Sequence, residues 1–77
     1  HVLIIPKIHI PTLNDLNEEH KNLMGELVFT AKILAEDLGI DDVGYRLNFN
    51  CNQAGGQTVY HIHLHLMGGR EFGWPPG

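Results

Sequence analysis

Residues 61–67 read His61-Ile62-His63-Leu64-His65-Leu66-Met67, so that imidazoles alternate with apolar side chains along this stretch. Successive side chains of a β-strand point to opposite faces, and the alternation therefore predicts a strand, which we place at about Thr58 to Met67. One face of this strand carries the three histidines. The other face packs on a core, and the residues expected there are Tyr60, Ile62, Leu64 and Leu66.

The remaining sequence predicts two more strands and one long helix. The apolar run from Val2 to Ile5 is typical of a short buried strand, and Tyr45 to Asn50 is expected to form another. The helix should begin at Asn14 or Asn17 and end at Gly39, because these residue types cap an apolar stripe with helical spacing. That stripe comprises Leu23, Leu27, Val28, Ala31, Leu34, Ala35 and Leu38. The order strand, helix, strand, strand predicts an α+β fold with one helix lying on an antiparallel sheet.

Composition narrows the class of protein. The 77 residues allow a single domain with a marginal core, which favours association with a partner subunit. Five basic and nine acidic residues give a net charge of -4, which argues against a nucleic-acid-binding surface. Cys51 alone cannot form an internal disulfide and suits a reducing, cytoplasmic environment. There is no run long enough to span a membrane and no recognisable signal peptide.

Three imidazoles on one face of a strand indicate a functional site more strongly than a solvated surface, where Thr, Lys, Glu or Ser would be usual. Two kinds of chemistry fit them, namely zinc binding and phosphoryl transfer with an imidazole as nucleophile. The preceding Gly55-Gly56-Gln57-Thr58 offers backbone N–H groups and a hydroxyl, which suit phosphate oxygens. No acidic or cysteine partner of a zinc site lies close by in sequence, so phosphate chemistry is favoured.

At these residues the chain resembles a known family. The stretch H-I-H-L-H-L-M fits the signature of the histidine triad superfamily, in which three histidines alternate with apolar residues. The G-G-Q-T-V-Y before it and the G-G-R-E-F-G-W-P-P-G after it are similar to the Hint branch, the purine nucleoside phosphoramidases. The opening H-V-L-I-I-P-K-I-H-I and the segment G-Y-R-L-N-F-N resemble that branch too, and the similarity runs from His1 to Gly77.

The resemblance implies a fold, an activity and a partner. It implies a HIT-like α+β domain, whose sheet is extended across a homodimer. The implied reaction is hydrolysis of the P–N bond of purine nucleoside 5'-monophosphoramidates through a nucleotidyl-histidine intermediate, without metal or other cofactor. The chain opens directly on the strand at His1, and we expect residues 1–77 to be a single domain that lacks its N-terminal portion. That portion would contribute much of the base and ribose pocket.

The resemblance also implies roles for five histidines. His63 would attack the α-phosphorus, His65 would bind the phosphate and assist proton transfer to the departing amine, and His61 would orient the neighbouring rings. His1 and His9 match family histidines that support the triad as a proton relay.

Further residues are implied for the nucleotide and for the leaving group. Asn50, together with backbone and hydroxyl groups at Gly56, Gln57 and Thr58, would hold the phosphate. The complete nucleotide-binding set is Asn50, Gly56, Gln57, Thr58, His63, Leu64 and His65. Trp74 would reach toward the partner subunit's site on the leaving-group side. Two alternatives remain open: an AMP-binding regulatory module with incidental turnover, and a zinc-binding protein.

Overall fold

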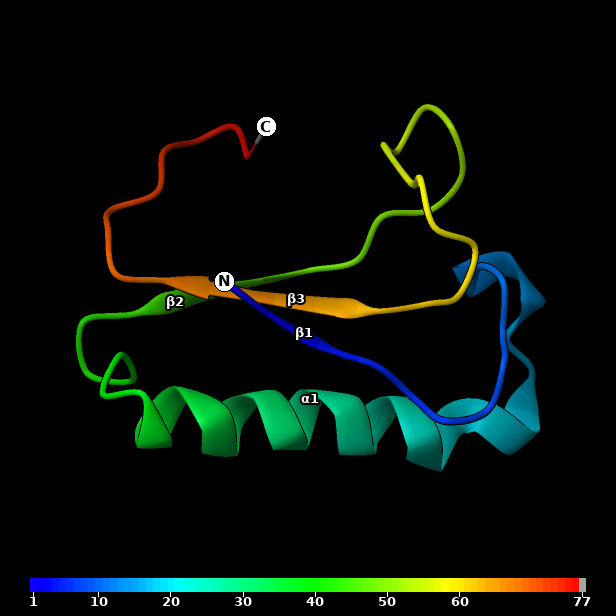
Figure 1. The fold of residues 1–77 in the computed structure, drawn as a ribbon, viewed down its shortest axis with the longest axis horizontal. Helices are drawn as coiled ribbons and strands as arrows, with labels where there is room; N and C mark the ends of the chain where they lie inside the picture. Colours follow the sequence, from blue (N-terminus) through cyan, green and yellow to red (C-terminus); the bar gives the residue numbers. More distant parts are fainter. Residues whose placement is uncertain (77) are drawn as a thin grey trace.

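The computed structural model describes residues 1–76 and contains a three-stranded antiparallel sheet and one long helix (Figure 1). The strands are β1 (Val2–Ile4), β2 (Tyr45–Asn48) and β3 (Leu64–Gly68), in the spatial order β1-β3-β2. The helix α1 spans Lys21–Asp37 and follows two 3₁₀ turns, η1 (Leu13–Asp15) and η2 (Glu18–His20). The predicted α+β fold is confirmed, whereas extension of the sheet across a homodimer stays a prediction.

Burial alternates along the histidine stretch as the sequence predicts. Ile62, Leu64 and Leu66 are 3%, 1% and 1% exposed and join the main apolar core. That core is completed by Ile4, Ile10, Leu27, Ala31 and Ala35. Figure 1 shows α1 running along one side of the sheet, so the apolar face of β3 is the one covered by the helix. The histidines therefore lie on the opposite, uncovered face.

Each strand is shorter than the sequence predicts, and Tyr60 is not buried. Tyr60 is 47% exposed, so its placement on the core face was wrong. Residues 58–63 lie outside β3, because before Leu64 the chain leaves its ladder partners and Ile62 donates its N–H to the carbonyl of Ile10 at 2.8 Å. β1 and β2 likewise end one and two residues before the predicted limits.

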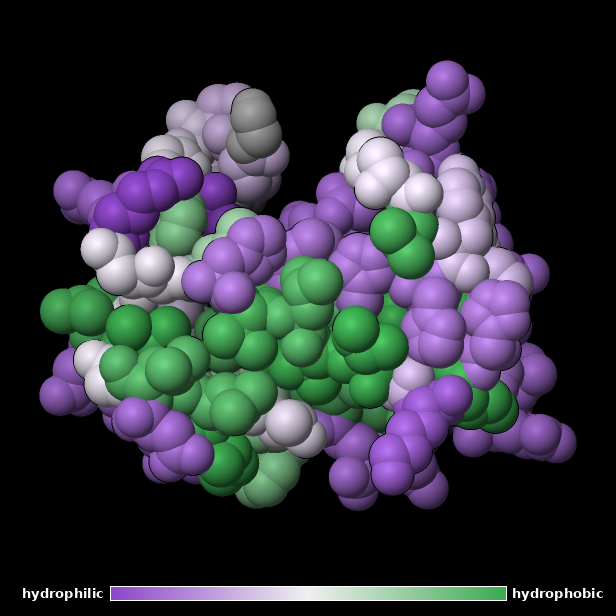
Figure 2. Space-filling view, viewed as in Figure 1, coloured by the Kyte–Doolittle hydropathy of each residue, from purple (hydrophilic) through white to green (hydrophobic). Residues whose placement is uncertain are grey.

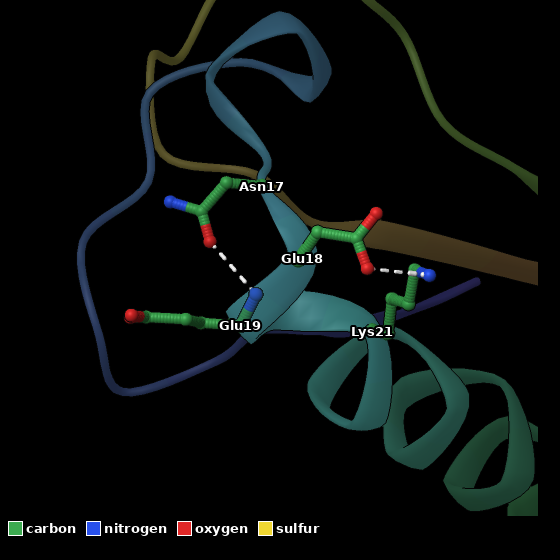
Figure 3. Close-up of polar contacts among 4 residues, drawn as sticks. All are labelled: Asn17, Glu18, Glu19 and Lys21. Atoms are coloured by element: carbon green, nitrogen blue, oxygen red, sulfur yellow. Dashed lines mark hydrogen bonds and ion pairs between the residues drawn. The ribbon is translucent and has the colours of Figure 1, made fainter.

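Asn17 caps the 3₁₀ turn η2, which runs directly into the long helix (Figure 3). Its side-chain oxygen accepts the N–H of Glu19 at 2.9 Å, which satisfies an unpaired donor at the start of η2. Glu18 and Lys21 form an exposed ion pair at 2.6 Å across the junction of η2 and α1. Asn17 thus caps the helical segment as predicted, whereas Asn14 lies inside η1, which Thr12 caps.

The end of α1 packs back onto the sheet. Gly39 has φ +72°, and Ile40 beyond it donates its N–H to Ala35 at 3.0 Å, the bonding of a Schellman cap. The side chain of Ile40 lies so close to Gly68 on β3 that a Cβ at Gly68 would overlap it. A glycine at the end of β3 therefore lets the helix terminus approach the sheet.

The predicted helix stripe is only partly buried. Leu27, Ala31 and Ala35 face the core, but Val28 and Leu38 are 47% and 55% exposed, so their assignment to the stripe was wrong. Part of the exposed side of α1 is nevertheless apolar, and Figure 2 shows a hydrophobic patch that runs over β1 and α1. Its exposed apolar residues include Leu3, Ile5, Val28, Phe29 and Ile33. Within residues 1–76 no helix is long and apolar enough to cross a membrane.

Candidate active site

The uncovered face of the sheet carries the candidate site. The segment between β2 and β3 and the C-terminal tail both rise from this face, and Figure 2 shows an open notch between them. On the sheet, His65 lies opposite Leu3 of β1 and Asn48 of β2. Strand partners in an antiparallel ladder point to the same face, so Asn48 shares the floor of the site with His65.

A backbone carbonyl fixes the tautomer of His63. Its Nδ1 lies 2.8 Å from the carbonyl oxygen of His61, and a carbonyl can only accept, so Nδ1 must carry the proton. In the neutral ring Nε2 then holds the lone pair. A basic nitrogen on a partly buried, oriented ring is what nucleophilic attack requires.

His61 and His9 form a second layer behind that ring. His61 donates from Nε2 to the carbonyl of Pro6 at 2.9 Å, and His9 donates from Nε2 to the carbonyl of Tyr60 at 3.0 Å. The two rings stack, with centroids 5.2 Å apart. Because the His61 carbonyl is the acceptor for His63, these contacts hold the backbone that orients the candidate nucleophile.

His1 and His65 form a hydrogen-bonded imidazole pair. His1 Nε2 and His65 Nδ1 lie 2.8 Å apart, so one nitrogen donates to the other. The ring of His65 also lies edge-on to that of His63, with centroids 4.9 Å apart. Burial, and secondarily the charge of His63, lower the pKa of His65 below its ordinary 6.5. The pair can pass a proton between two rings, one of which borders the candidate nucleophile.

The loop before β3 is braced largely from within. Asn50 donates to the carbonyl of Gly55 at 2.6 Å and accepts from the side chain of Asn48 at 3.0 Å. The buried amide of Gln57 accepts the N–H of Asn52 at 2.8 Å and donates to the carbonyls of Pro11 and Val59. A Cβ at Gly55 would overlap the backbone of Cys51, so the tight loop requires glycine there.

This bracing changes what the loop offers to a phosphate. The N–H groups of Gly56 and Gln57, expected to hold phosphate, instead donate to the carbonyls of Gln53 and Asn52 at 3.0 Å each. Thr58 is exposed, and neither its N–H nor its hydroxyl has a protein partner among residues 1–76. The side chain of Leu64 is buried, so it can approach a nucleotide only through its backbone.

The C-terminal tail is held by contacts that the sequence did not indicate. Arg46 donates to the carbonyl of Gly73 at 2.8 Å, and the guanidinium groups of Arg46 and Arg70 lie 5.0 and 4.4 Å from the ring centroid of Phe72. Trp74, next in the tail, is 83% exposed.

The histidine side chains do not form a metal cage. Across residues 1–76, no group of three or more His, Cys, Asp or Glu side chains is arranged to hold a metal ion. His61 and His63 each direct one ring nitrogen to a backbone carbonyl, so that this nitrogen is a hydrogen-bond donor in each ring.

A family model described as the HIT domain matches residues 1–72. The chain belongs to the HIT family. It is 53% identical over 73 residues to the purine nucleoside phosphoramidase of Escherichia coli K12. The aligned region covers 95% of this chain and 61% of that relative. An uncharacterised HIT-like protein of Synechococcus elongatus is 49% identical over the whole chain and 67% of its own length. The chain thus spans about three fifths of the phosphoramidase that it matches.

Solved HIT structures share the fold closely. A HIT family hydrolase from Legionella pneumophila superposes with a TM-score of 0.96 at 56% identity, over 97% of this chain and 67% of that one. A HIT family hydrolase from Clostridium thermocellum gives 0.88 at 48% identity, over 92% of this chain and 62% of that one. The HIT assignment therefore rests on sequence and on structure.

The lowered pKa of His65 generates a prediction. In the free protein at pH 7 the ring should be neutral, because its pKa lies below 6.5. Bound AMP should raise this pKa, since an adjacent phosphate favours the charged imidazole. NMR titration of the His65 ring protons with and without AMP measures the change. The signals of His20, on η2, should not respond to AMP, and a His65 titration curve unmoved by saturating AMP would place the phosphate elsewhere.

Proposed function

We propose that this HIT protein hydrolyses purine nucleoside 5'-monophosphoramidates, with His63 as the nucleophile. The observation that carries the proposal is the 2.8 Å hydrogen bond from His63 Nδ1 to the carbonyl of His61, which leaves Nε2 unprotonated and reactive. The name of the E. coli relative, a purine nucleoside phosphoramidase at 53% identity, supports the same reaction class. The purine preference comes from that relative alone, because residues 1–76 present no identified base pocket.

The first half of the proposed reaction transfers the nucleotidyl group to the protein. The lone pair on His63 Nε2 forms a bond to the α-phosphorus, and the P–N bond to the amine breaks. The departing nitrogen takes a proton from His65, which is charged in the substrate complex because the adjacent phosphate raises its pKa. The ring of His65 lies beside His63 and hydrogen-bonds to His1. Protonation matters here because an amide anion is too basic to leave.

The second half releases the nucleotide. Water attacks the phosphorus of the nucleotidyl-histidine, its proton passes to His65, and the bond to His63 breaks. The charged phosphate is held in this proposal by His65, the amide of Asn50 and the hydroxyl and N–H of Thr58. His61 and His9 act as positioning residues, since they hold the carbonyl that fixes the His63 ring. Each half is a single displacement at phosphorus, so the departure of the amine and the attack of water take place in separate steps.

The test of the nucleophile is the substitution His63→Ala in the full-length protein. Hydrolysis of adenosine 5'-phosphoramidate should fall at least about a thousandfold, because no other ring nitrogen occupies the same position. Acid-quenched wild-type protein should carry a nucleotidyl adduct by mass spectrometry, and the variant should not. His20→Gln, a histidine change away from the site, should keep both turnover and adduct. Equal rates for wild type and His63→Ala would refute the assignment, and AMP binding without turnover by the wild type would favour a regulatory module.

We further propose that the protein acts as a homodimer, with the second copy covering the apolar side of α1. Met24, Val28 and Phe29 line a hollow of about 710 Å³ on that side, and Phe29 is 63% exposed. An apolar surface of this kind is usually covered by a partner. Analytical ultracentrifugation of the full-length protein should give the mass of two chains, and Phe29→Glu should give one. A wild-type protein that sediments as a monomer would contradict the proposal.

A further inference from the structure

A second cavity lies next to the candidate active site, between β2 and the C-terminal tail. It measures about 260 Å³, and its lining includes Arg46, Asn48, Asn50, Arg70 and Phe72. Asn50 is also one of the residues assigned above to the phosphate. The cavity therefore continues the candidate site and is not a separate feature of the surface.

Two guanidinium groups give this cavity a positive charge. Within residues 1–76 the ion pairs join Lys21 to Glu18 and Lys32 to Glu36, and no carboxylate lies within ion-pair distance of Arg46 or Arg70. Each arginine donates one hydrogen bond to a backbone carbonyl, whereas a guanidinium carries five N–H donors. In a chain of net charge -4, two arginines on one small cavity, without an ion-pair partner among the described residues, provide spare donors suited to an anion.

Phe72 keeps the two arginines together. Both guanidinium groups lie over its ring, that of Arg46 at 5.0 Å and that of Arg70 at 4.4 Å from the ring centroid. Two like charges that line one cavity repel each other, and the attraction of each cation to the ring offsets part of this repulsion. The stack thus holds two cations in a fixed arrangement while leaving most of their N–H donors unused.

The ladder register places this cavity next to His65, on the side away from His63. Asn48 lies opposite His65, and Arg46 lies opposite Met67, one same-face position further along both strands. Same-face neighbours of this kind are separated by roughly 7 Å, which a long arginine side chain can span. A group on the amine that His65 protonates, if it points away from His63, would reach the cavity that Arg46 and Arg70 line.

We propose that Arg46 and Arg70 bind a carboxylate on the departing amine, so that nucleoside phosphoramidates of amino acids with a free carboxylate are preferred substrates. This inference rests on the function proposed above and assigns the class of leaving group. The hydrogen bond from Arg46 to Gly73 also positions the tail, and that structural role is compatible with binding an anion.

The experiment compares two substrates that differ only in charge on the leaving group. These are the adenosine 5'-phosphoramidates of alanine and of alaninamide, hydrolysed by the full-length protein. The quantity of interest is the ratio of their kcat/KM values. Comparing this ratio between variants removes the intrinsic difference in reactivity between the two amines. A variant that fails to fold loses activity on both substrates and does not mimic a change of preference.

In Arg70→Gln the ratio of carboxylate to carboxamide substrate should fall about fivefold from the wild-type value, the size expected for a partly solvated ion pair. Arg70→Lys should retain part of the preference, because it keeps the charge. Lys21→Gln removes one positive charge from the start of the helix and should leave the ratio unchanged. Raising the salt concentration should reduce the wild-type ratio toward that of Arg70→Gln.

Other outcomes overturn the inference in distinguishable ways. Wild type and Arg70→Gln with the same ratio would show that the cavity does not bind the carboxylate, while hydrolysis of both substrates would leave the phosphoramidase proposal standing. If neither substrate is hydrolysed, the proposed function and this inference both fail. ADP binding that is tighter than AMP binding and weakened in Arg70→Gln, without a carboxylate preference, would assign the cavity to a phosphate instead.

Discussion

The burial of Ile62, Leu64 and Leu66 against α1 is the constraint on which the rest of this structure depends. These side chains are at most 3% exposed, so the orientation of the whole stretch is fixed by the core. Alternation then directs the intervening imidazoles to the uncovered face. A shift of one residue in register would bury the histidines and expose the core. The same packing that stabilises a small domain therefore determines which side of the sheet can react.

Orientation of the rings comes from backbone carbonyls and not from carboxylates. His61, His63 and His9 each direct a ring nitrogen to a carbonyl, of Pro6, His61 and Tyr60 respectively. A carbonyl is a fixed acceptor that does not titrate, so it specifies the tautomer at every pH at which the ring is neutral. The orientation of His63 therefore depends on the path of the main chain after β1 and before β3.

The sequence was sufficient to predict the layers of the fold but not the ends of the strands. The alternation at 61–67 and the caps at Asn17 and Gly39 are local signals, and the structure confirms them. Tyr60 was misplaced because the chain leaves the sheet before Leu64, which depends on long-range bonds such as that from Ile62 to Ile10. The burial of Val28 and Leu38 was overestimated because helical spacing does not show how wide a face the sheet can cover.

For the site, the sequence pattern indicated the histidines, but it could not predict contacts among residues that are distant in the sequence. The pairing of His1 with His65 joins positions 64 apart, and the Arg46–Phe72–Arg70 stack joins β2 to the tail. Likewise, no local signal shows that the N–H groups of Gly56 and Gln57 are used inside their own loop. Such contacts follow from tertiary packing. The local sequence pattern does not show them, and only the resemblance to HIT proteins suggested some of the residues that take part.

The central claim is that the fold presents His63 with its proton on Nδ1 and a free lone pair on Nε2. Heteronuclear NMR of the ring nitrogens in the substrate-free protein, at a pH where His63 is neutral, measures this directly. The account predicts a protonated Nδ1 and an unprotonated Nε2, with the Nδ1 proton protected from exchange by its bond to the His61 carbonyl. A neutral His63 that carries its proton on Nε2 would contradict the account.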